Sequence, residues 1–596
     1  KDKGIRHAAT PPPWQIAGGG VGIFVGGFQP VVIELENSIN RAGMNFYSEY
    51  FSKDRTLIIR QLVNKSTSEK PMDTEFVFNN IFFSLMGVNS KEEIGFRGVR
   101  RHYAEYMFVG VRGPGLSSVC LRTALERVAN FAAIRNPRKI LKRLELFASK
   151  AIAKCPPCRR HISEFEIIDE AISDVTHESM GDGCGYISDE LLSELLSTKS
   201  QNTHLAVQVR VFGPQLGVWK GMLCRKPGIR GVQLTESMRK VGRSVVCDDE
   251  WVSLVIIRVS PSTSSSELSR LYKGFPPSKH FQKKDLSPMI RNVWMALGVP
   301  KGVVYKYERN KIPSHNGGFV GLADPTSSLP SKHVFVTGVH DNVEPFPDKV
   351  FITRSPCVRP EDGRILPVIH SKPDGMSTEH WEWMLNLPFG GVIFSTQGNG
   401  VPLPAICADG DLDGDLYFLC WADDILNYIT PRPEPKASAA ASSVGLAVAV
   451  SSNVSSPQQS ARSGSSINGT VVSGINKLGI IKHRREYIPS VHGSPPGHIS
   501  NSNGYSSISE SPTTRNWFEE VQRHVVTSNL ADEHALVAKM YNLMQKVHET
   551  SNLGMDDPDA IAYANAYLSA IDRGKHDIEV LLPPHLLKAL GVKPKK

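Results

Sequence analysis

An acidic loop with an apolar strand behind it constrains this chain more than any other feature of its sequence. Residues 408–421 read ADGDLDGDLYFLCW, and three carboxylates occupy alternate positions as Asp411, Asp413 and Asp415. Neighbouring glycines allow tight turns, and the apolar run that follows predicts a buried strand. Because carboxylates this close repel one another, they require neutralisation or a cation between them. Oxygen ligands on a short loop favour Mg²⁺ or Mn²⁺ over zinc.

Several kinds of site share part of this pattern. An EF-hand calcium loop begins with the same spacing, but its twelfth position requires Glu and is Cys420 here. A phosphatase of the haloacid dehalogenase type has D-x-D-G, but Asp415 replaces the Thr or Val that should follow. A solvated acidic turn would not lead into LYFLCW, which needs burial. The remaining alternative is a nucleotidyl-transfer site, where two ions about 3.5–4 Å apart act on a phosphate.

Composition sets the outer limits. The 596 residues are 40% hydrophobic, which is sufficient for about two to four domains. No run of apolar residues is long enough to predict a transmembrane helix. The net charge of +9 fits a polyanionic partner. Because the chain starts at Lys1 rather than Met, we expect a fragment.

The cysteines predict where the protein works. Nine of them are spread along the chain without a dense disulfide pattern, so we expect reduced thiols in an intracellular protein. The short basic run 482–485 leaves nucleus and cytoplasm as alternatives. Cys155 and Cys158 lie near His161 in a partial zinc pattern, but a second Cys pair at the usual spacing is absent from the sequence. We therefore expect unliganded thiols there.

Periodicity and composition divide the chain into regions. The β-rich stretches contain strands such as 205–212, which alternates strictly and places Gln208 and Arg210 on one face. The basic, helix-like stretch 121–153 is a candidate for lining a nucleic-acid channel. In order, we expect a mixed α/β region at 1–165, a β unit with basic residues at 166–260, connecting helices at 261–318, a β unit with the acidic loop at 319–430, a low-complexity and disordered insertion at 431–512, and a helical region at 513–596.

Short motifs along the chain show a collinear resemblance. The order of these motifs is similar to that of the cellular, eukaryotic RNA-dependent RNA polymerases of RNA silencing. The similar segments are D-G-C-G at 182–185, Q-x-R at 208–210 with K-G at 220–221, S-M-x-K at 237–240, G-x-x-D-x-x-x-x-L at 321–329, R-x-P at 354–356, the acidic loop at 410–421, and A-I-D-x-x-K at 570–575. Several collinear matches are more specific than one acidic loop.

The resemblance implies an α+β fold with two double-psi β-barrels forming a catalytic cleft, flanked by helical N-terminal and C-terminal regions. The regions 166–260 and 319–430 would be these barrels. The implied catalytic metal ligands for Mg²⁺ (or Mn²⁺) are Asp411, Asp413 and Asp415. The implied nucleotide- or phosphate-binding residues are Arg210, Lys220, Lys240 and Lys575.

The implied activity is that of an RNA-directed RNA polymerase, a nucleotidyltransferase. Its partners would be a single-stranded RNA template, nucleoside triphosphates and a double-stranded RNA product that serves RNA silencing, with no membrane. The chain departs from the family pattern at Val401 and Thr235, where the family has Arg. Those departures favour an alternative, a weakly active homologue that binds RNA as a scaffold. A haloacid dehalogenase-like phosphatase is the third hypothesis.

Overall fold

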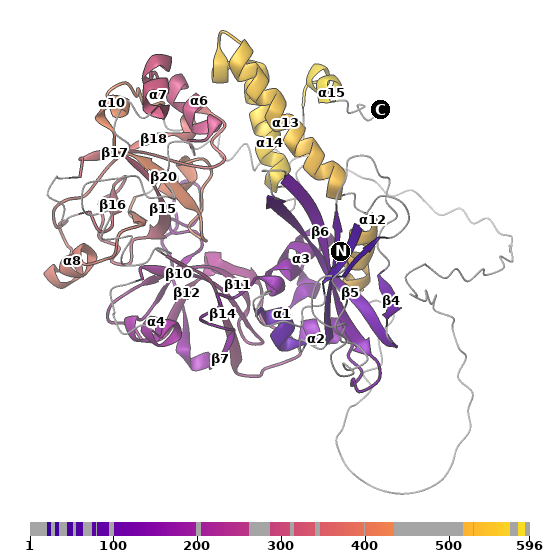
Figure 1. Cartoon of the computed structure of the whole chain (residues 1–596). Helices are drawn as coiled ribbons and strands as arrows, with labels where there is room; N and C mark the ends of the chain where they lie inside the picture. The colour runs from indigo at the N-terminus through magenta and orange to yellow at the C-terminus, as the bar shows by residue number, and fades with distance from the viewer. Residues whose placement is uncertain are drawn as a thin grey trace, which may run out of the picture.

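Three β-sheets and the helices around them make up the protein (Figure 1). The computed structural model describes residues 21–24, 30–34, 44–51, 55–62, 74–78, 80–94, 100–197, 204–260, 286–309, 315–339, 346–398, 400–433, 516–527, 530–572 and 582–590. In Figure 1 two barrel-like sheets lie on the left, one above the other, and the N-terminal sheet lies on the right. The α+β class expected from the sequence is confirmed.

The N-terminal sheet is fully antiparallel and has the strand order β1-β2-β3-β6-β5-β4. Its centre is a long hairpin whose strands bury Phe83, Leu85 and Phe108. Three short helices of the same region and α12 pack against it. The strands are β1 (Val21–Phe24), β2 (Pro30–Glu34), β3 (Thr56–Leu62), β4 (Glu75–Phe78), β5 (Ile81–Ile94) and β6 (Arg100–Arg112); the helices are α1 (Phe46–Tyr50), α2 (Leu121–Glu126), α3 (Pro137–Leu144) and α12 (Trp517–Thr527).

The first barrel contains both parallel and antiparallel pairs, with the order β7-β14-β10-β11-β9-β12-β8 and β13 paired to β11. Its interior is filled by apolar residues such as Val209, Trp219 and Leu254. Ser188 caps the helix α4 (Asp189–Leu196), since its side chain accepts from the N–H of Leu191. The strands are β7 (Cys158–His161), β8 (Phe165–Ile168), β9 (Cys184–Ile187), β10 (Ala206–Gly213), β11 (Gly217–Arg225), β12 (Val232–Thr235), β13 (Arg239–Val241) and β14 (Trp251–Ser260).

The second barrel has the order β16-β19-β15-β20-β17-β18. A bridge between Val334 and Val368 links its two edges, so the sheet nearly closes. The strands are β15 (Asn316–Ala323), β16 (Val334–Val336), β17 (Lys349–Arg354), β18 (Arg364–Pro367), β19 (Gly391–Phe394) and β20 (Leu416–Cys420); the helices beside them are α6 (Pro288–Ala296), α7 (Lys301–Glu308), α8 (Thr378–Leu385), α9 (Leu403–Ile406) and α10 (Asp423–Leu426).

The two barrels share one hydrophobic core. Leu205, Met222 and Cys224 of the first barrel lie in the same buried cluster as Phe319 and Phe394 of the second. Because this core is continuous, the position of one barrel fixes the position of the other. Loops at the junction are therefore held from both sides.

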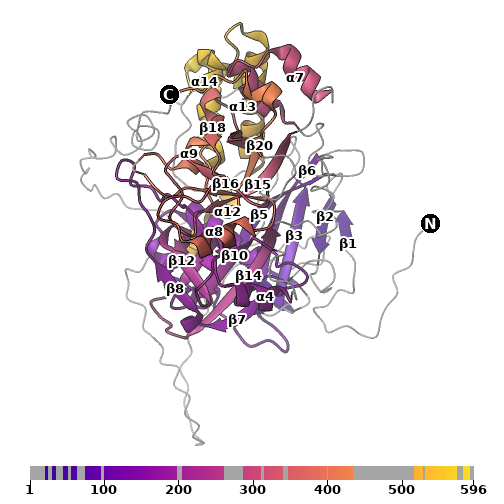
Figure 2. The same cartoon turned by 90° about the vertical axis from the view of Figure 1, so that its left-hand side faces the viewer.

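The C-terminal helices α13 (Leu530–Thr550), α14 (Pro558–Asp572) and α15 (Pro584–Leu590) form their own apolar cluster. Both views place α13 and α14 at the same end of the molecule as α7 (Figure 2). The side chain of Asn292 in α6 donates to Gln545 in α13 at 2.9 Å, which ties this cluster to the second barrel. Within the described ranges, no helix has the length and hydropathy needed to cross a bilayer.

Most of the predicted insertion and much of the predicted connecting region cannot be compared with the structure. Residues 261–285 of the predicted connecting helices and 434–512 of the predicted insertion lie outside the described residues. The described part of the connecting region contains α6 and α7.

Candidate active site

The acidic loop connects α9 to β20 and brings its three carboxylates together. Oxygens of Asp411, Asp413 and Asp415 all lie within 4.8 Å of one another, and no other such cluster of metal-ligating groups occurs in the described part of the chain. The backbone N–H of Asp411 donates to a carboxylate oxygen of Asp415 at 3.2 Å, and that of Asp413 donates to Asp411 at 3.3 Å. The tight turn at the glycines thus brings the three carboxylates close to one another.

The carboxylates differ in how easily they ionise. Burial, together with the negative charges of Asp413 and Asp415, raises the pKa of Asp411 to about 7. Burial also acts to raise the pKa of Asp413, but Lys220 and other cations outweigh it and hold that pKa below its ordinary value. A divalent cation would offset the repulsion from Asp413 and Asp415 that contributes to this raised pKa. The donor set therefore fits Mg²⁺ or Mn²⁺, which prefer carboxylate oxygens.

Two cations pair directly with the triad. Lys220 of β11 places its Nζ 2.7 Å from Asp413, and Arg354 of β17 forms an ion pair with Asp415. Arg354 also donates to the carbonyl of Ala408 at 3.0 Å. One cation therefore comes from each barrel.

Two further cations face the triad without pairing to it. Arg210 of β10 is buried, donates to the carbonyl of Val209 at 2.8 Å, and has a pKa lowered to about 10 by burial. Lys240 of β13 donates to the carbonyl of Ser237 at 2.7 Å, and burial lowers its pKa while Asp413 opposes that change. Buried cations that lack a carboxylate partner are suited to bind phosphate oxygens.

Both barrels also hold the backbone of the loop. From the first barrel side, the carbonyl of Asp182 accepts from Leu412 N–H at 2.7 Å. From the second, Gly321 N–H donates to the carbonyl of Asp415 at 3.2 Å, and the Tyr417 hydroxyl donates to the carbonyl of Asp411 at 3.0 Å. The loop is thus fixed at both ends.

The predicted residues converge, with one exception. The structure brings Asp411, Asp413, Asp415, Arg210, Lys220 and Lys240 together, whereas Lys575 lies outside the described residues. The additional acid Asp409 stays apart from the triad and pairs with Arg359 at 2.8 Å. Thr235 is buried and donates to the carbonyl of Cys184. A neutral side chain therefore occupies the position at which the family pattern has Arg.

Sequence reasoning did not select several residues that contact or face the triad. Arg354 and Gln208 belong to motifs that the sequence showed, R-x-P and Q-x-R, but they were not among the selected site residues. Arg143 lies in the basic stretch that was a candidate nucleic-acid channel, and its charge interacts with that of Asp413. Arg258 carried no signal, because only the pairing of β14 with β10 brings it to the loop.

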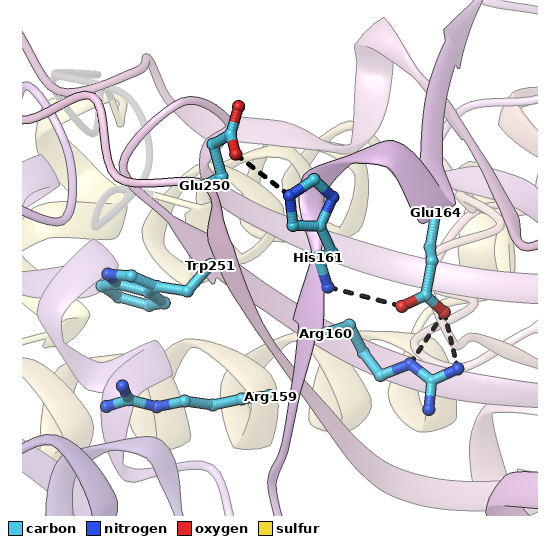
Figure 3. A pocket seen from close by; sticks show the side chains of 6 residues that line it. All are labelled: Arg159, Arg160, His161, Glu164, Glu250 and Trp251. Carbon is cyan, nitrogen blue, oxygen red and sulfur yellow. Dashed lines mark hydrogen bonds and ion pairs between the residues drawn. The ribbon is translucent and has the colours of Figure 1, made fainter.

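A separate surface pocket lies where β7 meets the start of β14 (Figure 3). Its charged side chains already have partners: His161 contacts Glu250 at 3.0 Å and Arg160 pairs with Glu164. The guanidinium of Arg159 stacks on the ring of Trp251, with its central carbon 5.2 Å from the ring centroid. Because these charges are satisfied internally, the pocket offers no unpaired group for a ligand, unlike the triad.

Comparison with known proteins agrees with this geometry. A family model described as "RNA dependent RNA polymerase" matches residues 54–272 and 279–595. The chain belongs to this RNA-dependent RNA polymerase family. The solved structure of "RNA dependent RNA polymerase QDE-1 from Thielavia terrestris" superposes on 92% of this chain and 62% of its own, with a TM-score of 0.54 and 14% identity. This likeness supports the predicted pair of double-psi β-barrels.

Relatives in plants share shorter segments with this family member. "Probable RNA-dependent RNA polymerase 1" of Oryza sativa subsp. japonica is 33% identical over 123 residues, which are 19% of this chain and 14% of that protein. "RNA-dependent RNA polymerase 1" of Arabidopsis thaliana is 31% identical over 84 residues, 14% of this chain and 6% of that protein. The matched segments thus span a small part of the length of these curated relatives.

Proposed function

We propose that this chain is an RNA-directed RNA polymerase that copies a single-stranded RNA template from nucleoside triphosphates. The double-stranded product would serve RNA silencing, as the resemblance in sequence implies. The observation that carries the proposal is the convergence of three carboxylates and several cations at the junction of the two barrels. Carboxylates that bind divalent ions beside unpaired cations are what nucleotidyl transfer requires.

The acidic and basic side chains of the site would have different roles in the reaction. Asp411, Asp413 and Asp415 would hold the divalent ions, which activate a 3′-hydroxyl and bind the triphosphate when present. Arg210 and Lys240 would neutralise charge on the phosphates as the bond to pyrophosphate breaks. Template binding would be mainly to the RNA backbone and would therefore weaken as salt rises.

Labelled nucleotide incorporation on single-stranded RNA with Mg²⁺ or Mn²⁺ tests the proposal. We expect template-dependent product from the wild-type chain and none from Asp413→Ala. Asp409→Ala is the matched control, because this neighbouring acid pairs with Arg359 outside the triad and its loss should leave incorporation intact. Product from Asp413→Ala, or product without template, would contradict the proposal.

An RNA-binding scaffold is the second candidate, because Thr235 and Val401 occupy positions where the family has Arg. The scaffold function predicts salt-sensitive RNA binding, with no nucleotide incorporation by the wild-type chain or by Asp413→Ala. Membership in the polymerase family leaves the phosphatase hypothesis without support. That hypothesis would require hydrolysis of a small phosphate ester in the absence of RNA.

A further inference from the structure

Two side chains of the first barrel reach consecutive carbonyls of the metal loop. The amide nitrogen Nε2 of Gln208 donates to the carbonyl of Asp413 at 2.8 Å. The guanidinium of Arg258 donates through Nη2 to the carbonyl of Gly414. These two carbonyls lie between the side chains of Asp413 and Asp415, so both donors act on the peptide units that orient two of the three carboxylates.

Strand pairing explains why the two donors lie side by side. Gln208 of β10 and Arg258 of β14 are register partners in an antiparallel pair, so their side chains leave the same face of the sheet. The register shifts immediately after this pair, between Gln208 and Val209. A bulge of this kind changes the direction in which a neighbouring side chain points. The irregularity therefore occurs where the sheet meets the loop.

The loop is shaped to receive the amide. Gly414 has a φ of +135°, and a β-carbon there would lie 1.9 Å from Nε2 of Gln208. Only glycine satisfies both conditions, since other residues rarely adopt this backbone conformation and any side chain would displace Gln208. The glycine of the acidic motif thus serves the contact between barrels as well as the turn.

Burial adds to the argument. Nε of Arg258 is buried and has no hydrogen-bond partner. Burying an unpaired donor costs stability, whereas the same atom on the surface would donate to water. The side chain also lies within the electrostatic influence of Asp413 and Asp415. Arg258 is therefore directed toward the loop rather than toward solvent.

We propose that Gln208 and Arg258 form a clamp that positions Asp413 and Asp415 for metal binding. Both are positioning residues, because the hydrogen bonds that they donate to the loop go to its backbone carbonyls and not to the carboxylate oxygens. The proposal rests on the metal-binding part of the proposed function. It adds that the first barrel, through this strand pair, sets the affinity of a metal site whose ligands all belong to the second.

Mn²⁺ titration of the full chain, followed by the electron paramagnetic resonance of free Mn²⁺, tests the clamp without measuring polymerase activity. Gln208→Leu should raise the Mn²⁺ Kd by roughly 10-fold or more, the usual effect of losing a group that orients metal ligands. Gln208→Met, which is closer in shape, guards against a folding defect, and circular dichroism checks both. Gln215→Leu is the control, because Gln215 also donates its amide to a carbonyl, that of Asp248 at 2.9 Å, but away from the loop.

Arg258→Gln separates positioning from charge. Removing a positive charge near the acids would by itself tighten Mn²⁺ binding, whereas losing the clamp weakens it. We expect weaker binding. An unchanged Kd in folded Gln208→Met and Gln208→Leu, or tighter binding in Arg258→Gln, would overturn the clamp.

The same titration separates the two proposals. Wild-type protein that binds Mn²⁺ but incorporates no nucleotide would contradict the polymerase proposal and leave the clamp to be decided by its variants. Wild-type protein that binds no Mn²⁺ would overturn the metal site and the clamp together.

Discussion

At the residue scale, glycine positions decide how closely the barrels approach at the triad. Gly183 has a φ of +84°, and a β-carbon on it would lie 2.5 Å from the Cβ of Asp413. Its N–H donates to the hydroxyl oxygen of Ser237 at 2.9 Å. The D-G-C-G turn is therefore packed directly against the central metal ligand.

Gly183→Ala should weaken Mn²⁺ binding in addition to lowering the stability of the fold. Alanine at a positive φ costs about 1–2 kcal/mol wherever it occurs. Gly228→Ala is the matched control, because Gly228 has a φ of +73° and no atom within 4 Å of the added carbon. We expect Gly183→Ala to lose more stability than Gly228→Ala in chemical denaturation, because only its added carbon meets other atoms, and only Gly183→Ala to lose Mn²⁺ affinity. Equal Mn²⁺ affinities would show that Asp413 tolerates the added carbon.

Arg143 of α3 offers a test of phosphate binding from outside the barrels. Burial lowers the pKa of its guanidinium while the Asp413 carboxylate opposes that change, and its Nε is buried without a hydrogen-bond partner. We expect Arg143→Gln to lower kcat/KM for nucleoside triphosphates about tenfold, a loss of about 1.4 kcal/mol of transition-state stabilisation. Mn²⁺ affinity should not fall, because removing a cation near Asp413 does not weaken cation binding.

Steady-state kinetics over a range of nucleotide concentrations make this measurement. Arg138→Gln on another face of the same helix is the control, and it should leave kcat/KM near the wild-type value. A similar loss in both variants would indicate a general effect of the net charge of α3 instead of a contact made by Arg143.

The sequence predicted the residues of the site unevenly, for a physical reason. Asp411, Asp413 and Asp415 lie on one short loop, so their spacing alone implied a shared cation. Arg258 could not be selected in this way, because it reaches the loop only through the pairing of β10 with β14, which is set by long-range contacts. Arg354 belonged to a visible motif, but its ion pair with Asp415 depends on β17 lying beside β20.

At the scale of elements, apolar patterns predicted strands better than they predicted long helices. The strand expected at 205–212 corresponds to β10. The helix-like stretch 121–153 is instead divided into α2 and α3, because Asn136 and Pro137 begin a new helix with its own cap. The long β5–β6 hairpin was not anticipated, since the sequence of residues 89–104 is mostly polar and lacks a continuous apolar signal.

The junction between α6 and α13 should loosen as the pH falls. Nδ1 of His548 in α13 accepts from the side-chain amide of Asn292 in α6 at 3.4 Å, and its Nε2 is buried without a partner. Burial lowers the pKa of His548 below its ordinary value of 6.5. The unfolded chain therefore binds more protons than the folded one, so this contribution to stability is present above about pH 6.5 and is lost as pH falls.

Hydrogen–deuterium exchange of α13 between pH 8 and pH 5, corrected for intrinsic rates, measures this effect. We expect protection of α13 to fall with pH in the wild-type chain and to change less in His548→Gln, whose side chain stays neutral. His333→Gln, at a partly exposed position in the second barrel, should behave like the wild type. A pH dependence that persists in His548→Gln would assign it to another group.

At the scale of the whole molecule, contacts between distant segments complete the fold. Trp517 and Gln522 of α12 pack on the N-terminal sheet, where Gln522 donates to the carbonyl of Leu85 at 2.8 Å. The sequence predicted helices at the C-terminus, but a helical pattern does not identify the surface that the helix covers. The same limit applies to the barrels, whose shared core joins residues far apart in the chain.

The barrel interface itself should control the metal site from a distance. Gly391 of β19 lies against Leu205, which is fully buried just before β10, and a β-carbon on Gly391 would lie 2.2 Å from Cδ2 of that leucine. Gly391→Ala should therefore displace β10, the strand that carries Gln208, and cost about 1–3 kcal/mol through overpacking. We expect Mn²⁺ affinity to fall with it, although neither residue belongs to the acidic loop.

A second substitution tests whether this coupling is mechanical. Adding Leu205→Ala removes the atoms that clash, so the double variant should recover Mn²⁺ affinity even though the smaller side chain lowers stability. Gly242→Ala, with no atom within 4 Å of the added carbon, is the control and should bind Mn²⁺ as the wild type does. If Gly391→Ala lost stability but kept its Mn²⁺ affinity, the second barrel alone would fix the loop. Recovery in the double variant would instead mean that packing between the two barrels sets the positions of the three carboxylates.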